Sequence, residues 1–109
     1  LGYPGVVISD DLEMKAVADR YGVSESAVRA IEAGCDLLLV CSDVDACFAA
    51  REALARRASE DAVFAARLRE AGDRTLAMRA KVPSTPLSGD ALRDALNDPE
   101  ARALEEVLA

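Results

Sequence analysis

Two short, unbroken apolar runs constrain the fold of this chain more than any other feature of its sequence. The first covers Val6, Val7 and Ile8, and the second follows Asp36 and continues to Cys41. Neither run is long enough for a helix of its own, and neither alternates between apolar and polar residues as a half-buried strand does. Such runs are typical of parallel strands that are buried on both faces. We therefore predict one strand at each run.

The segment between the two runs is predicted to contain a loop and then a helix. The loop takes residues 12–22, because polarity rises abruptly after the first run. The helix has Ser24 in position to act as N-cap, Val28 and Ile31 on its buried face, and Gly34 in position to end it. Two parallel strands joined by a helical crossover belong to an α/β sheet. The sequence therefore predicts the α/β class.

The rest of the chain is predicted to be helical. Ser42 and Ser59 are in position to cap two amphipathic helices, and two prolines within residues 81–86 then break the pattern. Asp98-Pro99 has the residue types favoured at the start of a helix. Short helices are accordingly expected at residues 90–96 and 99–108.

The composition excludes several kinds of partner and cofactor. Asp and Glu number 20 against 13 Lys and Arg, for a net charge of −7, so nucleic-acid binding is not expected. No apolar run approaches the roughly 18 residues needed to cross a bilayer, so no membrane partner is expected. Cys35, Cys41 and Cys47 lack the spacing of a zinc site, and the chain has no histidine. We expect no metal and no cofactor, buried cysteines in a reducing compartment, and a cytoplasmic location.

Chemistry is expected directly after the first predicted strand. Parallel α/β folds bind ligands at the carboxyl ends of their strands, and Asp10 and Asp11 occupy that place. Paired carboxylates are common in active sites and also in solvated loops, so the pattern alone leaves both interpretations open. Asp36 opens the second predicted strand, at the opposite end from the chemistry, and is expected to be structural.

The segment that contains the aspartate pair resembles the nucleophile segment of family-3 glycoside hydrolases. Residues 1–14 read Leu-Gly-Tyr-Pro-Gly-Val-Val-Ile-Ser-Asp-Asp-Leu-Glu-Met, in which a Gly-aromatic-x-Gly turn precedes an apolar strand that ends in Ser-Asp. The Asp-Asp-Leu-x-Met continuation is similar to the bacterial β-N-acetylhexosaminidase branch. Residues 30–40 are similar to the helix and final barrel strand that follow in the family. The resemblance covers about residues 1–42.

The resemblance implies a fold and a domain organisation. The chain would hold the last two βα units of a (β/α)8 TIM-type barrel followed by additional C-terminal helices. A complete barrel takes about 250 residues. Residues 1–82 would therefore form the C-terminal part of a glycoside hydrolase barrel domain, and residues 83–109 a proline-containing linker and helical tail.

The resemblance also implies roles for individual residues. Asp10 is expected to be the catalytic nucleophile, which attacks the anomeric carbon and forms a covalent glycosyl-enzyme intermediate. Asp11, Leu12 and Met14 are expected to bind substrate, the latter two around an N-acetyl group. A turn cap remains open for Asp11, and core positions remain open for Leu12 and Met14. Glu13 is expected to be solvated rather than catalytic.

The implied substrate is a carbohydrate with a terminal β-linked N-acetylglucosamine, as in the muropeptides of peptidoglycan recycling. In this branch a histidine on a mobile loop acts as acid and base, and a Lys-His motif binds the sugar. This chain contains no histidine. The resemblance therefore implies that a missing N-terminal portion of the barrel is required and that this chain alone is inactive.

Two other classes of protein remain open. A flavodoxin-like receiver or regulatory module would use Asp10 and Asp11 to bind Mg²⁺ and accept a phosphoryl group, but it would need about five strands, and the sequence predicts two. A non-catalytic helical interaction domain would account for the amphipathic helices between Val44 and Met78. It would leave the two apolar runs without a role.

Overall fold

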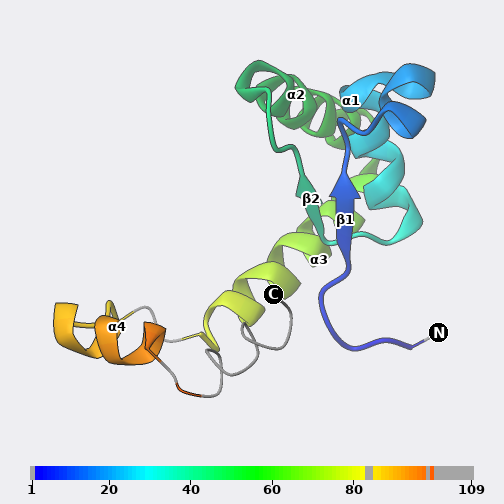
Figure 1. Cartoon of the computed structure of the whole chain (residues 1–109). Helices are drawn as coiled ribbons and strands as arrows, with labels where there is room; N and C mark the ends of the chain where they lie inside the picture. The colour runs from blue at the N-terminus through cyan, green and yellow to red at the C-terminus, as the bar shows by residue number, and fades with distance from the viewer. Residues whose placement is uncertain (1, 83–84, 98, 100–109) are drawn as a thin grey trace.

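The computed structural model describes residues 2–82, 85–97 and 99, which form a parallel strand pair and four helices. β1 (Ile8–Asp11) and β2 (Leu37–Leu39) pair in parallel, with Ile8 opposite Leu37 and Asp11 opposite Leu39 (Figure 1). The predicted α/β class and the parallel pairing are confirmed. The element order is β1 (Ile8–Asp11), α1 (Lys15–Ala33), β2 (Leu37–Leu39), α2 (Val44–Glu60), α3 (Ala62–Arg79) and α4 (Gly89–Leu96).

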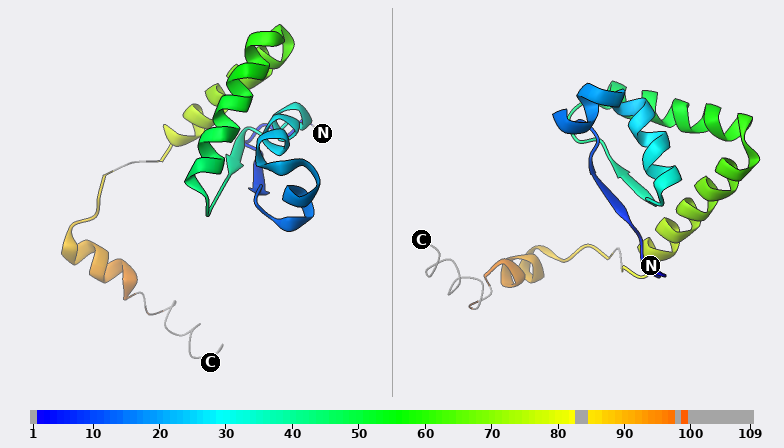
Figure 2. Two further views of the ribbon diagram at one scale, coloured as in Figure 1. Left: turned by 90° about the horizontal axis from the view of Figure 1, so that it is seen from above. Right: turned by 90° about the vertical axis from the view of Figure 1, so that its right-hand side faces the viewer.

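β1 lies later in the sequence than predicted. It begins at Ile8 and includes both aspartates, so the prediction of a strand at residues 6–8 was wrong in its bounds. From the Ile8–Leu37 pair to the Asp11–Leu39 pair, β1 advances by three residues and β2 by two. This difference indicates a bulge in β1. Burial on both faces was also wrong for this chain, because Ile8 remains 49% exposed. The right-hand view of Figure 2 shows α2, α3 and the C-terminal half of α1 on one side of the strands.

The connection between the strands is helical almost from its start. α1 begins at Lys15, so the loop predicted for residues 12–22 was wrong: the Met14 carbonyl accepts hydrogen bonds from the Val17 and Ala18 amides and opens the first turn at once. Gly22 has φ 68° and ψ 161° and kinks the helix. The predicted end at Gly34 is confirmed, since this residue adopts φ 111° as a left-handed C-cap.

Aspartates, not serines, cap the two long helices that follow. The Asp43 carboxylate accepts hydrogen bonds from two amides of the first turn of α2, and Asp61 does the same for α3. Ser59 lies inside α2, where its hydroxyl donates to the carbonyl of Arg56. A carboxylate at this position also interacts favourably with the positive end of the helix dipole, which gives it an advantage over a hydroxyl.

The short helix predicted for residues 90–96 is confirmed. α4 occupies Gly89–Leu96, with Ser88 as its N-cap, close to the predicted helix at residues 90–96. It lies away from the strands and the first three helices (Figure 1). The helix predicted for residues 99–108 lies almost entirely outside the described residues.

The core is small and rich in alanine. One cluster of buried residues contains Leu12, Ala27 and Ala50, and the other contains Ile31, Phe64 and Ala71. Ile31 is buried as predicted, Val28 packs beside it, and Leu38 contacts both clusters.

Cys41 and Cys47 are exposed, so the predicted burial of the cysteines was wrong for these two. Within the described ranges, no helix has both the length and the apolar character required to span a bilayer.

Candidate active site at the carboxyl ends of the strands

Asp10 lies on the open face of the strand pair. Along β1 the side chains alternate between exposed and half-buried positions, and Asp10 shares the exposed side with Ile8. Its Oδ1 accepts a hydrogen bond of 2.8 Å from the amide of Asp11. The side chain that the sequence singled out as a nucleophile is therefore open to a ligand, on a strand whose backbone is held by its neighbour.

Asp11 forms the turn that follows. Its Oδ1 accepts a 3.1 Å hydrogen bond from the amide of Glu13, and its carbonyl accepts one from the amide of Met14. The turn-cap interpretation of Asp11 is thus the one that these contacts favour. Cys41, two residues after the end of β2, also lies beside Asp11. Partial desolvation raises the pKa of the Cys41 thiol, and the charge of Asp11 and a hydrogen bond to it raise that pKa further.

Glu13 is not simply solvated. Its carboxylate accepts hydrogen bonds from three consecutive backbone amides of the loop between β2 and α2: Cys41 at 2.7 Å, Ser42 at 2.6 Å and Asp43 at 3.0 Å. Glu13 was expected to be solvated rather than catalytic, and the structure adds that its carboxylate is bonded to this loop. No local pattern indicates this contact, because its partners lie 28 to 30 residues away along the chain.

Leu12 and Met14, the other two residues expected to bind substrate, differ in their exposure. Leu12 is 6% exposed and packs against Ala27 and Ala50, which favours its core role over substrate binding. Met14 is 48% exposed and remains available to a ligand. Ser9, which the sequence did not single out, accepts a 3.1 Å hydrogen bond at Oγ from the amide of Leu39 and ties the two strands together beside Asp10.

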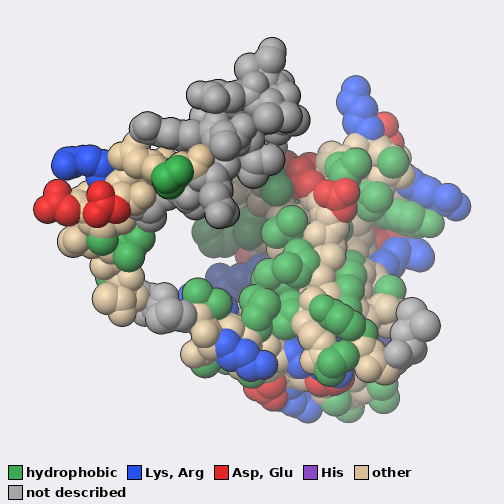
Figure 3. Space-filling view, turned by 60° about the horizontal axis from the view of Figure 1, so that its bottom comes forward, with side chains coloured by type: hydrophobic (Ala, Val, Ile, Leu, Met, Phe, Trp, Pro, Cys, Tyr) green, Lys and Arg blue, Asp and Glu red, His purple; other side chains and the backbone are tan. Residues whose placement is uncertain are grey.

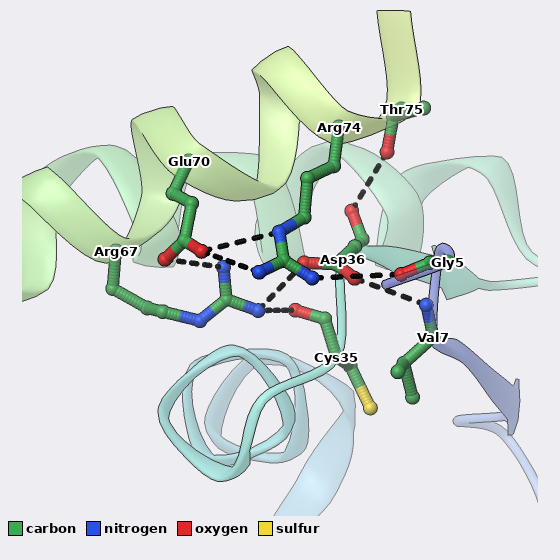
Figure 4. Close-up of polar contacts among 8 residues, drawn as sticks. All are labelled: Gly5, Val7, Cys35, Asp36, Arg67, Glu70, Arg74 and Thr75. Carbon is green, nitrogen blue, oxygen red and sulfur yellow. Dashed lines mark hydrogen bonds and ion pairs between the residues drawn. The ribbon is translucent and has the colours of Figure 1, made fainter. Parts of the chain in front are cut away.

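Asp36 anchors the opposite ends of the strands, as Figure 4 shows. Its buried carboxylate accepts hydrogen bonds from the Val7 amide at 3.0 Å and from Arg67 Nη2 at 2.8 Å, and its carbonyl accepts one from Thr75 Oγ1 at 3.1 Å. Burial alone would raise the pKa of Asp36, but the Val7 amide and the Arg67 guanidinium hold it below its usual value. The predicted structural role of Asp36 is confirmed.

α3 supplies the cations of this anchor. Arg67 also donates to the carbonyl of Cys35 at 2.9 Å, and Arg74 reaches the carbonyl of Gly5 at 3.5 Å (Figure 4). Glu70 lies between the two arginines and pairs with Arg74 at 2.8 Å. Sequence reasoning assigned α3 only an amphipathic character and did not anticipate that its arginines fix the starts of both strands.

Comparison with known proteins identifies the family. Residues 1–78 match the model described as "Glycosyl hydrolase family 3 N terminal domain". A beta-hexosaminidase of Neisseria gonorrhoeae (strain NCCP11945) is 44% identical over 45 residues, which are 41% of this chain and 12% of that protein. A beta-hexosaminidase of Alkalilimnicola ehrlichii is 48% identical over 46 residues, which are 42% of this chain and 13% of that protein. A beta-hexosaminidase of Vibrio cholerae (strain M66-2) is 44% identical over 46 residues, 42% of this chain and 14% of that protein.

The matched stretch is therefore a small part of each relative, and no solved structure matches the chain. The flavodoxin-like receiver module is not favoured, because the family model matches residues 1–78, the region that contains both strands and both aspartates. The helical interaction domain has no support either, since the match includes both strands. With the family model covering residues 1–78 of 109, the chain belongs to glycosyl hydrolase family 3.

Proposed function

We propose that this chain carries the nucleophile of a retaining β-N-acetylhexosaminidase, and that Asp10 is that nucleophile. The observation that carries the proposal is the position of Asp10: its carboxylate is exposed at the carboxyl end of a parallel strand, where α/β folds place their chemistry. The relatives named Beta-hexosaminidase support the choice of activity within the family. The substrate would be a terminal β-linked N-acetylglucosaminide, such as a muropeptide in peptidoglycan recycling, met in the cytoplasm.

The chemistry requires one ionised carboxylate and one proton donor on opposite sides of the glycosidic bond. Asp10 would attack the anomeric carbon as the bond to the leaving oxygen breaks, and the acid would protonate that oxygen. Water, activated by the same acid/base group, would then attack the anomeric carbon and release Asp10. The chain contains no histidine, so the histidine that the resemblance implies would come from another part of the protein.

The fold supports a barrel as the setting for this reaction. α2, α3 and the C-terminal half of α1 lie on one side of the strands, as helices lie outside a (β/α)8 barrel. The opposite face leaves Ile8 49% and Leu39 39% exposed, although both are apolar. Further apolar side chains are open to solvent on the face drawn in Figure 3. The two βα units would be the last of the barrel, residues 1–82 would complete its C-terminal part, and residues 83–109 would form a linker and tail.

Turnover by the whole protein tests the proposal. An aryl β-N-acetylglucosaminide is the substrate, and Asp10→Asn is compared with Asp11→Asn. The proposal requires that Asp10→Asn lose nearly all turnover and that Asp11→Asn keep a measurable part of it. Normal turnover by Asp10→Asn would reject the proposal.

A further inference from the structure

Glu13 joins the segment after Asp10 to the loop that leaves β2. Its Oε2 accepts from the amides of Cys41 and Ser42, and its Oε1 accepts from the amide of Asp43, all within 3.0 Å. The three donors are consecutive, so one carboxylate binds residues 41–43, which lead from β2 into α2 and end at its N-cap, Asp43.

These bonds are of a strong kind. Hydrogen bonds to an ionised acceptor are about twice as strong as bonds between neutral groups. The loop also leads into the N-terminus of α2, where the helix dipole favours a negative charge. Glu13 therefore stabilises a loop conformation in which three amides point toward the end of β1.

Two further contacts close the same junction. The amide of Leu12 donates to the carbonyl of Leu39 at 3.0 Å, and the amide of Leu39 donates to Ser9 Oγ at 3.1 Å. Asp10 thus lies between two residues, Ser9 and Leu12, that are both bonded to Leu39. Glu13 extends this attachment beyond the strand, to the loop of residues 41–43.

We propose that Glu13 is a positioning residue of the reaction. By binding the amides of residues 41–43 it holds the turn of residues 11–13 against that loop. The same turn includes the Asp11 amide that donates to Asp10 Oδ1, so Glu13 fixes the backbone from which the Asp10 carboxylate projects. The inference rests on the proposed function, in which Asp10 is the nucleophile. A displacement of about 1 Å at a reacting group can lower a rate about 100-fold, so a loop released from Glu13 would slow the reaction without removing any group that reacts.

The test uses the whole protein with Glu13→Gln, Glu13→Asp and, as a control with the same loss of charge, Glu52→Gln on the exposed side of α2. Hydrogen exchange of the amides of residues 41–43 reports the loop directly and does not depend on activity. Steady-state kinetics on an aryl β-N-acetylglucosaminide report the consequence for Asp10.

We expect amides 41–43 to exchange at least about tenfold faster in Glu13→Gln, since an amide side chain accepts at one oxygen only. We expect kcat to fall about 10- to 100-fold with KM changed less than about threefold. Glu13→Asp, which keeps the charge but is shorter, should recover part of kcat, and Glu52→Gln should match the wild type. A loss of kcat that Glu13→Asp does not relieve would point to general destabilisation and overturn the inference.

The remaining outcomes separate the inference from the proposed function. Unchanged exchange in Glu13→Gln would show that the carboxylate does not hold the loop, and the inference would be wrong. Faster exchange with normal kcat, in a protein that Asp10→Asn inactivates, would reject the positioning role and leave the nucleophile in place. An active Asp10→Asn protein would reject the proposed function and, with it, the role assigned to Glu13.

Discussion

Asp36 and Arg67 form an ion pair of 2.8 Å at the amino ends of the two strands, in which the Asp36 side chain is 1% exposed. The same carboxylate accepts a hydrogen bond from the amide of Val7. This one pair therefore fixes the start of β1, the start of β2 and the middle of α3 relative to one another. The opposite, carboxyl ends of the strands, which carry Asp10, are thereby attached to a fixed base.

Breaking this pair should destabilise the fold strongly. Arg67→Met leaves the Asp36 carboxylate buried without its cation, for which the expected cost is about 3 kcal/mol of unfolding free energy. Arg69→Met, on the exposed side of the same helix, should change the unfolding free energy by less than about 0.5 kcal/mol. Denaturant titration of the two variants measures the difference. Equal stabilities would show that the pair does not anchor the strands.

The lowered pKa of Asp36 predicts a pH dependence of stability. Because the folded pKa lies below the unfolded value of about 3.9, the contribution of Asp36 is fully present above that value. It is lost as the pH falls through the lower pKa of the folded state. The unfolding free energy of the wild type should therefore fall more steeply below about pH 4 than that of Asp36→Asn. Parallel curves for the two proteins would contradict this assignment.

Alanine substitutions at Gly34 and Gly72 should change the stability of the protein in opposite directions. Gly34 adopts φ 111°, and although nothing lies within 4 Å of an added Cβ, the backbone itself disfavours alanine there by about 1 kcal/mol. Gly72 lies within α3, also with open space at its Cβ, so Gly72→Ala should stabilise the protein by up to about 1 kcal/mol. Thermal unfolding of both variants checks the signs. Destabilisation by Gly72→Ala would indicate a contact that the structure does not show.

Asp10 and Asp11 should differ sharply in the reaction although they are adjacent. Asp10→Asn removes the proposed nucleophile, so kcat should fall by several powers of ten. Asp11→Asn keeps an oxygen that can accept the Glu13 amide, so the turn survives and kcat should fall by roughly tenfold or less. Steady-state kinetics on the whole protein decide between them. Equal losses would mean that both carboxylates take part directly.

Local patterns predicted the parts of the fold that short stretches determine. The apolar run before Cys41 and the glycine at position 34 were sufficient to predict β2, the crossover helix and its end. The bounds of β1 were not predictable, because a bulge and pairing with β2 set them rather than hydrophobicity. The contacts of Glu13 with residues 41–43 and of Asp36 with Arg67 join residues about 30 positions apart, which no local pattern encodes.

Covalent trapping would identify the residue that attacks the anomeric carbon. A 2-fluoro sugar with a good leaving group slows the oxocarbenium-like transition states, because fluorine disfavours positive charge at the anomeric carbon, and the glycosyl-enzyme should accumulate. Mass spectrometry of a proteolytic digest of the whole protein then locates the added sugar. The account predicts the label on Asp10 and its absence in Asp10→Asn. A label on Asp11 or on any other residue would contradict it.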